Sequence, residues 1–155
     1  MADETPDLPA PTEREYITFT VADQHYCLDI QQIREIRRWT PVTPLPHAAH
    51  GVLGVMNLRG AVIPIYDMAA RLGLGDTQPS ERDVVIVAAL DSTSIGLLVE
   101  SVCEILTVKT DEIQPTPDVR SDATREAIRG VIAMDGQMTR ILELGFIADR
   151  SPVAA

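Results

Sequence analysis

The sequence is poor in cysteine, in aromatic residues and in positive charge. Its 155 residues hold two cysteines, Cys27 and Cys103, which fits reduced thiols better than a disulfide scaffold. Only 13 lysines and arginines stand against 23 aspartates and glutamates, a net charge of −10, and this acidity argues against nucleic acid as a partner. Aromatic residues amount to 4 % and hydrophobic residues to 45 %, so aliphatic side chains and methionine must form the core of a folded domain.

Membrane, catalytic and metal-binding motifs are missing as well. No apolar run approaches the ~20 residues of a membrane-spanning helix, and the acidic N-terminus does not look like a signal peptide, so we expect a cytoplasmic protein without direct membrane insertion. The chain contains no G-x-S-x-G elbow, phosphate-binding loop or paired-histidine zinc motif. His47 and His50 lie three residues apart, but nothing nearby completes a metal site. We expect no catalytic residue, no metal and no cofactor.

What the sequence does contain is a hairpin with an unusual turn. Two apolar runs, residues 52–56 and 61–65, flank the segment Asn57-Leu58-Arg59-Gly60. Such a pattern predicts a β-hairpin, and a two-residue turn requires φ above zero at both central positions. Asn-Gly or Asp-Gly is the usual choice, yet here arginine precedes the glycine. A residue that breaks the local preference is expected at a functional or strained site.

A second copy of this hairpin, with ordinary turn chemistry, follows later in the chain. Gly130–Glu143 matches Gly54–Asp67 at an offset of 76 residues, and the segment 86–105 matches 17–36 at an offset of 69. Two strand-rich copies predict two similar small β-barrels packed together. We place the first at about residues 36–80, with part of the N-terminal strands, and the second at about 83–147.

Local patterns predict the remaining elements. Residues 16–21 alternate as a half-buried strand, 25–29 form the return strand, and three-residue spacing of Ile30, Ile33 and Ile36 suits one helical turn before a strand over 33–39. Residues 40–46 form a proline-rich extended linker. Asp67 is placed to cap a short helix through Leu72, residues 111–122 form a loop, 122–128 a short helix, and a turn surrounds Phe146. Residues 1–13 and 151–155 are expected to be disordered or flexible tails.

Several segments resemble the bacterial chemotaxis coupling protein CheW family. These are Tyr16–Phe19, Ile30–Ile36, Leu45-Pro46, Gly54–Gly60, Ile63–Asp67, Gly96–Val102 and Ile113–Pro115. The resemblance runs from about residue 15 to 147, and the Asn-Leu-Arg-Gly block is its most specific part. It implies an all-β fold of two five-stranded SH3-like β-barrels packed together, with short helical connectors, in one domain over residues 14–150.

The same resemblance implies a non-enzymatic adaptor. It would couple methyl-accepting chemoreceptors to a histidine autokinase and scaffold receptor–kinase arrays, with the receptor's cytoplasmic signalling tip and the kinase's regulatory domain as partners. A coupling protein of a non-flagellar chemosensory pathway, pilus-type or other, is the alternative. The partner-binding residues would be Ile33, Glu35, Ile36, Arg37, Leu53, Asn57, Leu58, Arg59, Gly60 and Val62.

Each of these assignments has a plainer structural reading. Arg59 either supports the partner surface or caps backbone carbonyls where the two halves meet, because arginine is seldom buried unpaired. Glu35 has a counterpart in the repeat, Glu104, so it is either a contact or an ordinary exposed glutamate. The apolar residues either line a groove for a partner helix or belong to the barrel core.

Two functions of other classes remain to be tested. A small acidic enzyme of barrel fold would need a reacting set of side chains, and the sequence shows none. A nucleic-acid-binding barrel is disfavoured by the charge, and salt-sensitive binding to single strands would be needed to support it.

Overall fold

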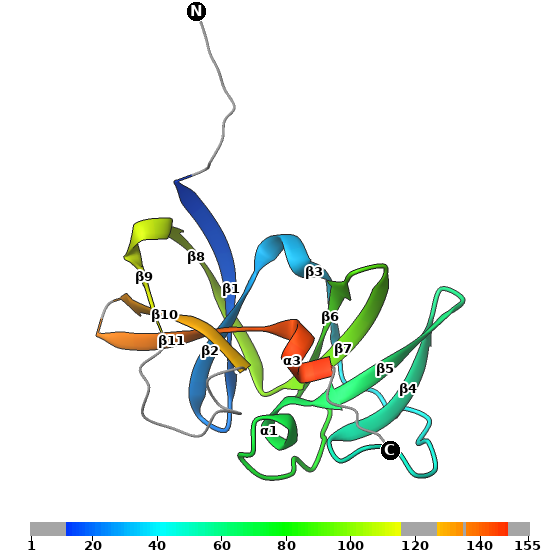
Figure 1. Ribbon diagram of the computed structural model, residues 1–155. Helices are drawn as coiled ribbons and strands as arrows, with labels where there is room; N and C mark the ends of the chain where they lie inside the picture. The colour runs from blue at the N-terminus through cyan, green and yellow to red at the C-terminus, as the bar shows by residue number, and fades with distance from the viewer. Residues whose placement is uncertain (1–11, 116–126, 135, 149–155) are drawn as a thin grey trace, which may run out of the picture.

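The computed structural model describes residues 12–115, 127–134 and 136–148, and shows two β-barrels side by side (Figure 1). Barrel A has the strand order β8-β1-β2-β11-β10-β9. Its strands are β1 (Glu13–Val21), β2 (Gln24–Asp29), β8 (Ser101–Lys109), β9 (Ile113–Gln114), β10 (Ile128–Met134) and β11 (Gln137–Leu142). Barrel B has the order β3-β6-β7-β5-β4. Its strands are β3 (Ile33–Arg38), β4 (Val52–Leu58), β5 (Ala61–Asp67), β6 (Val84–Leu90) and β7 (Thr93–Val99).

Short helical segments lie between strands or, in the case of α3, after the last strand. They are the 3-10 helices η2 (Ile30–Gln32) and η3 (Thr110–Glu112) and the α-helices α1 (Met68–Arg71) and α3 (Leu144–Ala148). The single turn predicted before residue 33 and the helix predicted after Asp67 are therefore confirmed. Within the described segments, no helix has the length and apolarity needed to cross a membrane. The helix predicted at 122–128 falls mostly outside the described residues, as does the predicted tail 151–155. The tail predicted at residues 1–13 is described only from residue 12, and Glu13 already belongs to β1.

The all-β class and the double barrel are as predicted, but the division of the chain between the barrels is not. β1 and β2 were assigned with the first barrel, and they pair instead with β8 and β11. β6 and β7 were assigned to the second barrel, and they pair with β3 and β5. Barrel B therefore occupies one continuous stretch, and barrel A takes both ends. Barrel A also counts six strands, because the two-residue β9, inside a predicted loop, pairs with β10.

Strand register confirms the internal repeat residue by residue. Barrel A combines the β1–β2 hairpin of the first copy with the β10–β11 hairpin of the second, and barrel B combines the β6–β7 hairpin of the second copy with the β4–β5 hairpin of the first. The two copies therefore exchange their first hairpins. The equivalent pairs are Phe19↔Tyr26 with Ala88↔Ile95, Ile17↔Ile105 with Ile86↔Ile36, and Cys27↔Ile141 with Gly96↔Ile65. These pairs keep the offsets of 69 and 76 seen in the sequence.

The hydrophobic core has three parts. The largest lies between the barrels and includes Phe19, Leu28, Met68, Ile86, Leu97, Leu142 and Ile147. A second fills barrel A, around Tyr16, Cys27, Val108, Ile132 and Ile141, and a third fills barrel B, around Ile63, Ile65, Val85, Val87 and Leu98. Alternate residues of β6 thus face the interior of barrel B and the core between the barrels, which explains why this strand is apolar on both sides.

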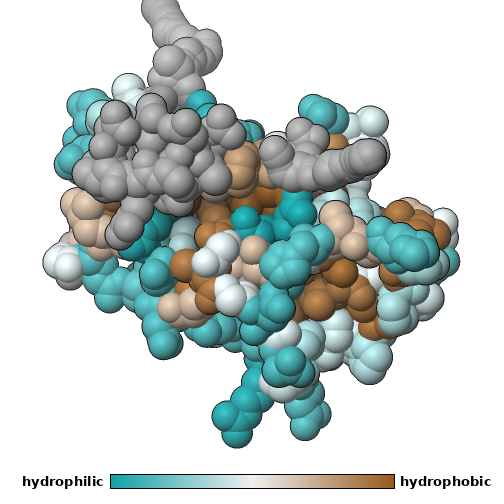
Figure 2. All heavy atoms as spheres, turned by 60° about the horizontal axis from the view of Figure 1, so that its bottom comes forward, coloured by the Kyte–Doolittle hydropathy of each residue, from teal (hydrophilic) through white to brown (hydrophobic). Residues whose placement is uncertain are grey.

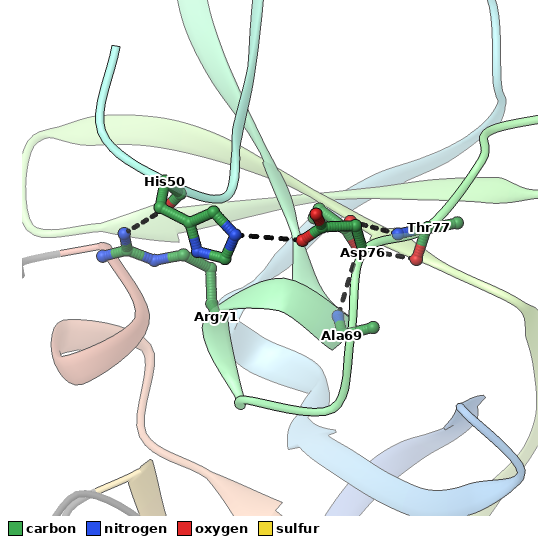
Figure 3. A network of polar contacts seen from close by, with 6 residues as sticks. His50, Ala69, Arg71, Asp76 and Thr77 are labelled. Atoms are coloured by element: carbon green, nitrogen blue, oxygen red, sulfur yellow. Dashed lines mark hydrogen bonds and ion pairs between the residues drawn. The ribbon is translucent and has the colours of Figure 1, made fainter.

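A buried carboxylate organises the connection after β5. Asp67 is 2 % exposed, and its side chain accepts hydrogen bonds from the backbone N–H of Ala69 at 3.2 Å and from the N–H and hydroxyl of Thr77 at 2.7 and 2.8 Å (Figure 3). The first bond caps α1 as predicted, and the other two fix the connector toward barrel B's next strand.

Arg71 ties the same helix to two distant segments. Its Nη1 donates to the carbonyl of His50 at 2.9 Å (Figure 3), and its Nε donates to the carbonyl of Ile147 in α3 at 2.9 Å. The guanidinium also lies over the ring of Tyr66, 5.4 Å from its centroid. His50 in turn contacts Asp76 through Nε2 at 3.0 Å. The network positions α1 and α3 against the core between the barrels.

The two cysteines differ in environment, and this predicts different reactivity. Cys27 is fully buried in barrel A, and burial, with a smaller contribution from Asp29, raises the pKa of its thiol to about 12; Cys103 is exposed on β8. Since the thiolate is the reactive form, we expect one thiol per folded chain to react with Ellman's reagent at about pH 8, and both in denaturant. Rapid reaction of both thiols in the folded chain would contradict the burial of Cys27.

Candidate functional site

The candidate site joins the edge strand β3 to the turn of the β4–β5 hairpin. On β3, Glu35 lies opposite Val87 of β6, and Ile36 lies opposite Ile86. Residues directly opposite in an antiparallel pair carry their side chains on the same face. The side chain of Glu35 therefore lies on the same side of the sheet as Val87, which lines the interior of barrel B. The side chain of Ile36 lies on the opposite side, with Ile86, which is turned toward barrel A. The two faces of β3 offer different chemistry.

The hairpin turn has the backbone that the sequence demanded. Arg59 has φ 53° and Gly60 has φ 89°, so both central residues are left-handed, as a two-residue hairpin turn requires. The side-chain oxygen of Asn57 accepts a hydrogen bond from the Gly60 N–H at 3.0 Å. This bond holds the turn, and it gives Asn57 a structural role in addition to its predicted place on the partner surface.

Arg59 uses this conformation to reach β3. Its Nη2 lies 2.7 Å from Oε1 of Glu35, and Nη1 of Arg37 lies 2.9 Å from Oε2 of the same carboxylate. The hydrogen bonds from Arg37 and then Arg59 lower the pKa of Glu35 below its usual range. The Glu35 side chain is 22 % exposed while that of Arg59 is 72 % exposed. The arginine thus pairs with a carboxylate rather than capping backbone carbonyls, and it closes the hairpin tip onto the edge strand.

The lowered pKa sets the direction of a pH effect. A carboxyl group whose pKa falls on folding contributes stability above its unfolded pKa of ~4.3, and loses it as pH drops through the lower folded value. We expect the stability difference between wild type and Glu35→Gln to be constant from about pH 7 to pH 5.5 and to shrink below about pH 4.3. Urea unfolding of both proteins across this range measures it. A difference that persists unchanged at about pH 3 would show that the ion pairs contribute nothing.

The structure separates the predicted site residues by exposure. Ile36 and Val62 are 42 % and 66 % exposed, and Asn57, Arg59 and Gly60 are also exposed. Glu35 and Arg37 are half-buried and joined to each other. Three residues pack within the chain: Ile33 against the core between the barrels, and Leu53 and Leu58 against the core of barrel B. Partner contact stays a prediction for the whole set, and the exposed members are better placed for it.

Two exposed apolar residues of barrel A were absent from the predicted set. Ile105 and Met138 in barrel A are 54 % and 51 % exposed, and they are the repeat equivalents of Ile36 and Val62 at offsets of 69 and 76. The repeat offsets were the signal that could have identified them. Figure 2 shows, on the side that carries α1, further hydrophobic side chains breaking a largely hydrophilic surface.

The described part of the chain shows no metal site beside these residues. Within the described ranges, no group of three or more histidine, cysteine, aspartate or glutamate side chains is placed to hold a metal ion. His50 pairs with Asp76 instead, in a solvent-exposed contact.

Comparison with known proteins identifies the family to which this chain belongs. The model of the CheW-like domain family matches residues 15–151. The chain belongs to the CheW-like domain family. It is 54 % identical over 131 residues to "Chemotaxis protein CheW" of Rhizobium meliloti (strain 1021), covering 84 % of each chain. It is 28 % identical over 137 residues to "Protein FrzA" of Myxococcus xanthus, covering 88 % of this chain and 85 % of that one.

A solved member of the CheW-like family shares the architecture. The crystal structure of the scaffolding protein TtCheW from Thermoanaerobacter tengcongensis matches with a TM-score of 0.81 at 27 % identity, over 88 % of this chain and 92 % of that chain. The likeness extends over both barrels, in accord with the pair of SH3-like barrels expected from the sequence.

Proposed function

We propose that this chain is a non-enzymatic chemotaxis adaptor that acts in the cytoplasm and couples chemoreceptors to a histidine autokinase within receptor–kinase arrays. The observation that carries the proposal is the fixed edge of barrel B. Arg59 and Arg37 hold Glu35 from two sides, beside the exposed Ile36, in a chain that is 54 % identical to a protein named for chemotaxis. A preorganised polar cluster beside exposed apolar side chains suits a protein interface.

The two partners would use separate surfaces. The receptor's cytoplasmic signalling tip would dock along β3 and the Arg59 turn, and the kinase's regulatory domain would dock elsewhere on the double barrel. Transmission of a signal requires that the adaptor bind two receptor states with different affinity, since equal affinity shifts no equilibrium.

Binding measurements with two purified partner fragments test this function. We expect the wild-type chain to bind both a receptor signalling-tip fragment and the kinase regulatory domain. Glu35→Arg should weaken the receptor complex by about tenfold or more, because it places a third positive charge between Arg37 and Arg59. The kinase complex should be unaffected.

Glu104 provides the matched control. It occupies the place of Glu35 in the other copy of the repeat and is exposed on β8, so Glu104→Arg makes the same charge change outside the proposed surface. Circular dichroism and melting verify that each variant is folded. If the folded wild-type chain binds neither fragment, or if both variants weaken receptor binding equally, the assignment of function to this edge is wrong.

A coupling role in a non-flagellar chemosensory pathway is the second candidate. Co-purification from the source cells distinguishes the two. Recovery of receptors and a kinase that do not serve flagellar motility would support the alternative. Recovery of the receptors and kinase of flagellar motility would exclude it.

A further inference from the structure

Four arginines lie close together on this acidic protein. Of its 13 basic residues, Arg34, Arg37, Arg38 and Arg59 gather on β3 and the adjacent turn, in a chain whose net charge is −10. A single carboxylate, Glu35, is shared by two of these arginines. The cluster therefore keeps a local excess of positive charge that Glu35 does not neutralise.

The excess resides mainly in Arg34 and Arg38. Both are exposed, and neither forms an ion pair with another residue of the described ranges. Arg34 lies at the β-bulge between Ile33 and Glu35, a feature that redirects side chains at sheet edges. Ile36, 42 % exposed, lies between the two arginines in the chain. The exposed side chains of β3 thus read basic, apolar, basic.

The barrel itself does not require these arginines. The repeat places Cys103 and Thr107 of β8 where β3 has Arg34 and Arg38, while Ile105 keeps the apolar residue at the place of Ile36. β8 pairs with β1 in the same register as β3 pairs with β6. Since one copy folds into the same edge strand without the arginines, their role lies outside barrel folding.

We propose that the exposed row Arg34–Ile36–Arg38 recognises an acidic amphipathic helix, in which one apolar side chain packs on Ile36 and two carboxylates flank it. The inference rests on the proposed function and specifies the chemistry of the receptor helix at that site. Arg34 and Arg38 lie four positions apart on β3, which corresponds to at most ~13 Å along the strand. Two turns of a helix rise ~11 Å. Carboxylates seven or eight positions apart, with the apolar residue midway, therefore match the row.

The alternative occupants fit less well. A phosphate-rich partner would gain nothing from the apolar Ile36, and an extended one would be repelled by the chain's net charge of −10. A carboxylate-bearing helix satisfies both parts, because arginine forms bidentate pairs with carboxylates and exposed aliphatic surface favours an apolar contact.

Charge reversal on the full-length chain tests the row. The double variant Arg34→Glu with Arg38→Glu should bind the receptor signalling-tip fragment about tenfold or more weakly than wild type. The affinity of wild type should fall as NaCl rises from about 50 to about 300 mM, and the affinity of the double variant should not. The control variant, Lys109→Glu with Arg129→Glu, makes the same charge change at exposed positions of barrel A, and should bind within about twofold of wild type. Melting checks that both variants are folded.

A designed helical peptide makes the test independent of the receptor. One peptide carries glutamates at positions i and i+7 around a leucine at i+4, and its partner carries lysines at the same two positions. We expect the acidic peptide, and not the basic one, to shift the methyl NMR signal of Ile36. No shift with the acidic peptide overturns the inference, as does wild-type receptor affinity in the Arg34/Arg38 variant. A shift without any receptor binding by wild type would instead overturn the proposed function.

Discussion

Gly54→Ala is expected to lower the free energy of unfolding by about 3 kcal/mol or more. Gly54 has φ 149°, a region that residues with a Cβ rarely adopt. A Cβ there would also collide with the carbonyl group of Thr43, whose carbon would lie 2.8 Å away. Thr43 and Val55 exchange two backbone hydrogen bonds of 2.9 and 2.8 Å that join the linker to β4. Relief of the collision would separate the linker from the barrel.

Gly60→Ala is the control that isolates backbone strain. Gly60 also has a positive φ, 89°, but nothing lies within 4 Å of a Cβ added there. Its replacement should cost only the strain of a left-handed alanine, about 1 kcal/mol. Urea unfolding of both variants beside wild type gives the two values. Equal losses would show that the approach of Thr43 to Gly54 is not a constraint on the fold.

The match of Gly54 with Gly130 was visible in the sequence, but its cause was not. A Cβ at Gly130 would lie 3.0 Å from the carbonyl oxygen of Gln114 and 2.9 Å from the side chain of Ile113. Each glycine therefore lets a segment that follows the edge strand pass close beside a hairpin. Composition and periodicity show where a glycine stands, whereas the segment that approaches it depends on the tertiary fold.

The exchange of hairpins between the copies was missed for a physical reason that the sequence contains. The offset of the repeat shows which residues of the two copies are equivalent. Equivalent residues would pair in the same register whether or not the copies exchange their hairpins, so the offset does not decide between the two arrangements. Connector length decides between them. If β8 paired with β6 of its own copy, it would run parallel to β7, and parallel strands need a crossover of about a dozen residues. Only Glu100 separates Val99 of β7 from Ser101 of β8, so the chain continues into the other barrel.

The candidate site was predictable in part. The misfit of arginine in a hairpin turn singled out Arg59, and its φ of 53° confirms the turn. Its ion partner was not predictable, because Glu35 reaches Arg59 only through the closure of barrel B. The alternation of β3 likewise could not distinguish the face shared with Val87 from the face shared with Ile86, since both neighbours are apolar and buried.

The second large effect concerns the coupling of the two barrels. Ile132 is 1 % exposed and belongs to the interior of barrel A. Truncation to alanine removes buried methyl groups and leaves a cavity, a cost of about 3 kcal/mol. Trp39, the single tryptophan, packs against the interior of barrel B. We expect Ile132→Ala to lower the unfolding midpoint recorded by Trp39 fluorescence as much as the midpoint recorded by circular dichroism.

The expectation follows from the core between the barrels. Leu28 of barrel A and Leu97 of barrel B are both fully buried in that cluster, so unfolding either barrel alone would expose apolar surface of the other at ~25 cal/mol per Å². Met138→Ala is the control on the same barrel, because its side chain is 51 % exposed and its loss should change stability by less than about 0.5 kcal/mol. If Trp39 keeps its wild-type midpoint in Ile132→Ala while circular dichroism shows an earlier transition, the barrels unfold separately. A shared midpoint means that the exchanged hairpins and their common core make one cooperative unit.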